Sequence, residues 1–109
     1  MDVVVAEAAD AATAQAVYNT ELAEAESKIS TDLPPGVHVN LDTSNTAGVG
    51  DMAATATGST TIAGKTISFT GIYVISGSTF FTIGDLVLDK APPTAAAIQA
   101  QAQTVIGRI

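Results

Sequence analysis

The stretch that decides the fold is residues 60–89, TTIAGKTISFTGIYVISGSTFFTIGDLVLD. β-Branched and aromatic residues dominate it, and a pleated sheet favours that composition. Two short glycine-containing segments, 63–65 and 76–78, divide the stretch, as expected for antiparallel hairpins. The sequence therefore predicts an antiparallel meander here, with Phe69 in its core.

The same meander extends at both ends. Residues 86–88 continue the last strand beyond Gly84 and Asp85, where we expect a β-bulge. Upstream, residues 37–41 alternate apolar and polar side chains, and residues 52–57 form a weaker strand of alanine and threonine. We expect a turn at Gly58-Ser59 and a loop over residues 42–51. The sheet then covers residues 37–89 with about four to five strands.

Helices are expected on either side of the sheet in the sequence. Residues 1–33 carry apolar side chains at steps of three or four, and Pro34-Pro35-Gly36 ends that pattern. Pro92-Pro93 introduces a shorter alanine-rich helix over residues 92–107. We expect the two helices to pack closely on one face of the sheet. The chain is thus predicted to be a single α+β domain.

The apolar stripe of the first helix is uneven. Its second half carries large residues such as Leu22 and Ile29, whereas its first half carries mostly alanine. The second half is therefore expected to dock on the domain, and the first half to project or to meet a partner helix. Packing on the chain's own second helix is the alternative. The candidate interface residues are Ala8, Ala11, Ala14 and Tyr18.

Composition and charge exclude several classes of function. The chain has 109 residues, no cysteine and a net charge of -7. Its four basic residues are spread along the sequence, so they offer no patch for nucleic acid or an anionic membrane. Without cysteine there is no disulfide and no thiolate zinc site. No stretch has the length and apolarity of a membrane span, and we predict no cofactor.

Few residues suggest chemistry. His38 is the only histidine, and it lies on the polar side of its strand with Asp42 as its one candidate partner. The loop oxygens of Asp42, Asn45 and Asp51 are candidate ligands for a hard cation. Their spacing departs from the helix-loop-helix calcium pattern, and a solvated turn uses the same residue types. Tyr73 is the best candidate for the polar group of a pocket.

Three functions remain open. A long alanine-rich helix entering a small antiparallel sheet is similar in layout to pilin-like filament subunits. That similarity implies self-assembly and an extracellular or cell-envelope location. The chain begins abruptly with an apolar run, and the sequence leaves open whether a leader or membrane segment was removed upstream. Pro-Pro-Gly-Val at residues 34–37 resembles small envelope-associated α+β domains, which implies a binding or adaptor module. A small pocket enzyme is the second alternative.

We therefore predict a non-enzymatic structural or self-assembling protein, whose partner is itself or another protein. A small-molecule ligand is left open by the sequence.

Overall fold

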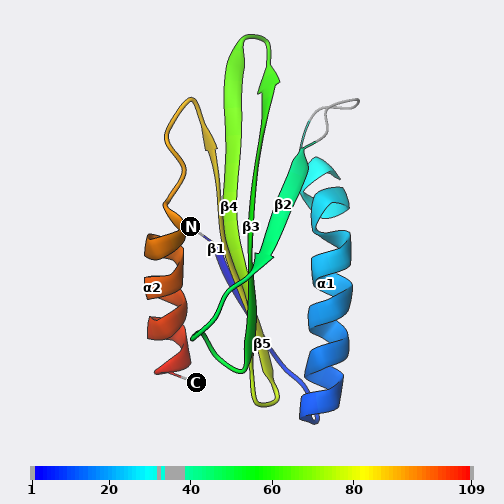
Figure 1. The fold of residues 1–109 in the computed structure, drawn as a ribbon. Coiled ribbons are helices and arrows are strands. Elements are labelled where there is room, and N and C mark those ends of the chain that lie inside the picture. Colours follow the sequence, from blue (N-terminus) through cyan, green and yellow to red (C-terminus); the bar gives the residue numbers. More distant parts are fainter. Residues whose placement is uncertain (1, 32, 34–38, 109) are drawn as a thin grey trace.

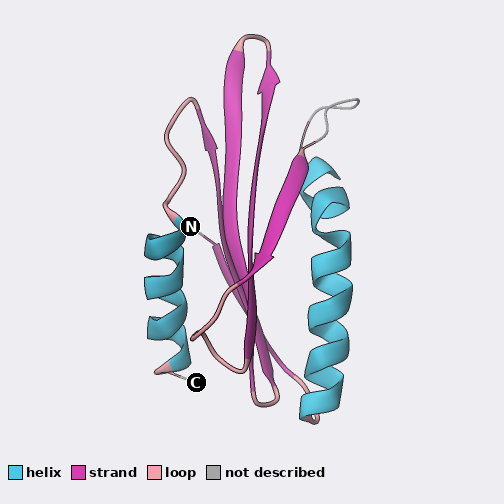
Figure 2. Ribbon diagram, in the orientation of Figure 1, coloured by secondary structure: helices cyan, strands magenta, loops and turns pink. Residues whose placement is uncertain are grey.

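The computed structural model describes residues 2–31, 33 and 39–108. Within these ranges, a five-stranded antiparallel sheet lies between two helices, one on each face (Figures 1 and 2). The elements are β1 (Asp2–Glu7), α1 (Ala11–Thr31), β2 (Asn40–Asn45), β3 (Met52–Ile62), β4 (Lys65–Ser76), β5 (Thr79–Leu88) and α2 (Ala95–Ile106). The predicted α+β class, with an N-terminal helix, an antiparallel sheet and a C-terminal helix, is confirmed.

The sheet has the order β1-β5-β4-β3-β2, and its central strands β3, β4 and β5 form the predicted meander. The β3–β4 hairpin turns through Ala63 and Gly64, whose φ angles are 50° and 80°. Two consecutive positive φ values give the two-residue turn that matches the twist of paired strands. The β4–β5 ladder runs in one register from Ile67↔Leu88 to Ser76↔Thr79. The expected bulge near Gly84 is therefore wrong.

Two segments expected to be turn or loop belong to strands. β3 continues through Gly58, and β2 extends as far as Asn45, well into the predicted loop. A Cβ atom added to Gly58 would lie 2.5 Å from the carbonyl oxygen of Asn40 and 2.8 Å from Leu41 Cδ2. Gly58 is thus needed for the close approach of β2, and its presence does not mark a turn.

The first residues form a strand, so the prediction of helix from residue 1 is wrong. β1 pairs antiparallel with β5, with Val4 opposite Thr82 and Val5 opposite Phe81. A run of β-branched valines favours this extended conformation. The helix begins only after Asp10, whose Oδ1 accepts a hydrogen bond of 2.7 Å from the amide of Thr13. Such an N-cap occupies one of the amides that a helix start leaves unpaired.

The two helices cover opposite faces of the sheet, so the expectation that they share one face is wrong (Figure 1). Phe80 points to the α1 side, and its neighbour Phe81 points to the α2 side, because side chains alternate along a strand. Both faces of β4 and β5 are apolar, so each face must be shielded from water by a helix. On the α2 side, Ile98 and Ala102 are fully buried.

The core also differs from expectation at one aromatic residue. Phe69 is only half-buried and packs at the margin of the α1-side core. The larger fully buried side chains include Phe81, Ile72 and Ile83, all on the α2 side.

Candidate functional site

The candidate cation ligands do not converge. Asp42 and Asn45 both belong to β2 and stand three residues apart, so their side chains leave opposite faces of the strand. Asp51 Oδ2 accepts a hydrogen bond of 2.7 Å from the amide of Gly77, which holds the β4–β5 turn. Among the residues that the structure describes, no three acidic or histidine side chains are grouped to hold a metal ion. His38 lies outside the described residues.

The alanine stripe of α1 faces the chain's own sheet. Ala14 is fully buried, and Tyr18 is buried against Phe80 with ring centroids 6.4 Å apart in an edge-to-face arrangement. Ala8 packs against the same core, and Ala11 is exposed. The prediction that the first half of the helix projects is therefore wrong. Of the four candidate interface residues, Ala11 alone is fully accessible to a partner.

The two edges of the sheet differ in a way that the sequence pattern did not indicate. In the described chain, β1 pairs with β5 on one side and has no strand on the other. Its Val4 and Val5 side chains are 59% and 47% exposed. They leave opposite faces of the strand, so both faces of this edge are apolar.

The opposite edge is protected. β2 has the polar sequence NLDTSN, and its Leu41 amide donates a hydrogen bond of 2.7 Å to the Glu26 carboxylate of α1. Proteins commonly blunt sheet edges with charge and covering side chains, because an open edge pairs readily with other strands. β1 lacks both devices at its centre.

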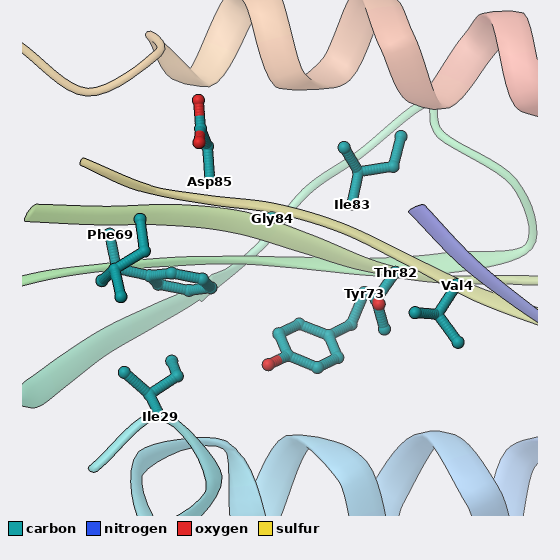
Figure 3. A pocket seen from close by; sticks show the side chains of 9 residues that line it. Val4, Ile29, Phe69, Tyr73, Thr82, Ile83, Gly84 and Asp85 are labelled. Carbon is teal, nitrogen blue, oxygen red and sulfur yellow. The ribbon is translucent and has the colours of Figure 1, made fainter. Parts of the chain in front are cut away.

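A pocket of about 250 Å³ lies between the sheet and the second half of α1 (Figure 3). The side chains that line it are Val4, Ile29, Phe69, Tyr73, Thr82 and Leu86. Figure 3 shows the side chains of Ile83 and Asp85 on the far side of the sheet, so these residues border the pocket through their backbone. The pocket is open on one side, its side-chain lining is mostly apolar, and hydroxyls are its polar side-chain groups.

Tyr73 supplies the main polar group of this pocket. Its side chain is 8% exposed and projects from β4 toward α1 (Figure 3). The hydroxyl has no hydrogen-bond partner in the described chain, and it is not sealed from the pocket space. Burial raises the pKa of Tyr73, and the Glu21 carboxylate raises it further, while Lys28 acts in the opposite direction. The hydroxyl is thus held protonated as a hydrogen-bond donor.

A comparison of the chain with protein-family models, curated proteins and solved structures finds no match. In the described ranges, neither helix combines the length and apolarity needed to cross a bilayer.

Proposed function

We propose that this protein is a non-enzymatic structural protein that self-associates by pairing β1 of one copy with β1 of a second copy. The observation that supports this is the open edge of the sheet, where Val4 and Val5 are exposed on opposite faces. An exposed apolar edge strand presents unpaired backbone groups to any strand of matching length.

A second copy fits this edge by symmetry. Two copies of an antiparallel strand are related by a two-fold axis perpendicular to the sheet. This rotation leaves the α1 faces of both copies on one side of the joined sheet and their α2 faces on the other. A register centred on Val4 then places Val4 of each copy side by side on the α1 side. Val4 is 59% exposed in the single chain, so this pairing would cover apolar surface on both copies.

Charge opposes this association and makes it dependent on salt. Each copy carries a net charge of -7, so two copies repel each other at low ionic strength. At about 0.15 M salt the screening length falls to about 8 Å, which weakens the repulsion between distant charges. Apolar contact and backbone pairing are short-ranged and are not screened, so self-association is expected to strengthen as salt is added.

This proposal keeps the structural class and changes the contact. The alanine stripe of α1 was the expected interface, but Ala14 and Tyr18 are buried beneath the helix. The pilin-like layout remains a prediction, and strand β1 ahead of α1 departs from it.

The test is light scattering of the parent chain over a concentration series at low and moderate salt. Val5→Lys places a charge at the centre of the edge, where it should keep the chain monomeric. The matched control is Leu88→Lys, which changes the net charge equally at an exposed site beyond the β1–β5 pairing. Circular dichroism should show parental secondary structure for both variants.

The proposal is wrong if the parent stays monomeric under all these conditions, or if Val5→Lys associates as strongly as Leu88→Lys.

A further inference from the structure

We propose that the pocket between α1 and the sheet binds a small neutral aliphatic molecule, whose one oxygen atom accepts a hydrogen bond from Tyr73. This site is separate from the self-association edge, and Val4 is the only side chain that the two proposals share.

The first support is the state of the Tyr73 hydroxyl. The side chain is more than nine-tenths buried, yet the hydroxyl has no partner in the described chain and faces the pocket. The hydroxyl oxygen itself remains accessible from the pocket, so a molecule in the pocket can reach it. A hydroxyl donates one hydrogen bond, and a ligand oxygen can accept it.

The second support is the apolar wall around that hydroxyl. Ile29 of α1 faces the sheet, and the ring of Phe69 lies along the surface of the sheet (Figure 3). At the mouth, Val4 and Leu86 remain 59% and 42% exposed. A bound aliphatic group would remove part of this surface from water, which is the main source of affinity for such sites.

Size and charge narrow the ligand further. About 250 Å³ is smaller than the roughly 300–1,000 Å³ of sites for drug-sized ligands, so the occupant is a short chain or a single ring. Glu21 acts electrostatically on Tyr73, which disfavours an anion at this end of the pocket. Lys28 offers little compensation, because it is already paired with Glu21 at 2.7 Å and with Glu24 at 3.6 Å. A neutral alcohol, ketone or ester therefore fits better than a carboxylate.

The test is a titration of the whole chain, followed by methyl NMR, with 1-heptanol and heptanoate as probes. We expect saturable shifts at the methyl groups of Ile29 and Leu86 with 1-heptanol, and weaker binding of heptanoate. Tyr73→Phe keeps the buried ring and removes the donor, so it should weaken heptanol binding by about two- to tenfold.

Tyr18→Phe is the matched control, because Tyr18 is buried on the same face but does not line the pocket. It should bind heptanol like the parent. Leu86→Glu alters only an exposed residue at the mouth, and it should also weaken heptanol binding without unfolding the chain. No saturable shift at the pocket methyls, equal binding by Tyr73→Phe and the parent, or preference for heptanoate would each overturn the proposal. The shifts are read at Ile29 and Leu86, which do not belong to strand β1.

Discussion

The ring of Phe69 lies over Gly71, two residues further along β4. A Cβ atom added to Gly71 would lie 2.7 Å from Phe69 Cζ and 3.1 Å from the backbone oxygen of Ile83. Gly71 is paired across the strands with Gly84, where an added Cβ would lie 3.1 Å from Phe69 Cε2. The two glycines thus make a strip without side chains, on which the ring rests at one end of the pocket.

Gly71→Ala should therefore destabilise the fold and displace the ring. We expect a loss of about 1–3 kcal/mol in the free energy of unfolding, because the new methyl group overpacks a site with backbone on one side. Gly84→Ala should lose less, since its nearest contacts are with the ring alone. Urea denaturation of both variants measures which of them loses more free energy of unfolding. Equal stability of both variants and the parent would show that the ring moves aside at no cost.

Phe81→Ala should destabilise the chain more than Phe69→Ala. Phe81 is fully buried on the α2 side, so its removal should cost about 3–5 kcal/mol. Phe69 is half-buried beside the pocket, and we expect about 2 kcal/mol for its removal. Thermal and urea unfolding would compare the two variants. A larger loss for Phe69→Ala than for Phe81→Ala would contradict the placement of Phe81 in the core and of Phe69 at its margin.

Ala14→Glu and Ala11→Glu should separate packing from surface effects on α1. Ala14 is fully buried beneath the helix, so a carboxylate there should cost at least about 3 kcal/mol or prevent folding. Ala11 is exposed one turn earlier, and its substitution should change stability by less than about 0.5 kcal/mol. Circular dichroism with urea measures both. A folded, stable Ala14→Glu chain would return the alanine stripe to consideration as an interface.

Asp51→Ala should weaken the β4–β5 turn through the lost hydrogen bond to Gly77. The bond is 2.7 Å long but exposed, so we expect about 1 kcal/mol of destabilisation. The loss should be the same in calcium chloride and in EDTA, because the proposed role involves no ion. A rise in the melting temperature of the parent with calcium, absent from Asp51→Ala, would favour the cation site instead.

Both tyrosines should ionise late in the folded chain. Burial raises the pKa of Tyr18 and of Tyr73, whereas an unfolded tyrosine ionises near about pH 10. The protonated hydroxyls thus contribute stability that is full below about pH 10 and is lost as the pH rises through the folded values. Absorbance of tyrosinate during alkaline titration tests this, with Tyr18→Phe and Tyr73→Phe to assign each step. If both tyrosine hydroxyls ionised near about pH 10 while the chain stayed folded, the prediction would be contradicted.

Some features missed at the level of sequence had a local signal. The valines at residues 3–5 favour a strand, and Asp10 followed by Thr13 is a helix N-cap pattern. The helical spacing of apolar residues that begins at Val4 overlaps both signals. In contrast, Gly58 has the same local appearance as a turn glycine, and only the approach of Asn40 and Leu41 shows why it is there.

The sequence by itself determined the three central strands and the presence of both helices. β-Branched and aromatic runs with two-residue turns are local properties, so strands β3, β4 and β5 and both helices could be located from residue order. Tertiary structure alone decided which faces the helices cover, that Asp42, Asn45 and Asp51 stay apart, and that Ile29 meets Phe69 and Tyr73 around one pocket. These relationships depend on strand order and on the side from which each helix packs. Neither is encoded by neighbouring residues, because both follow from burying two apolar faces of one sheet at once.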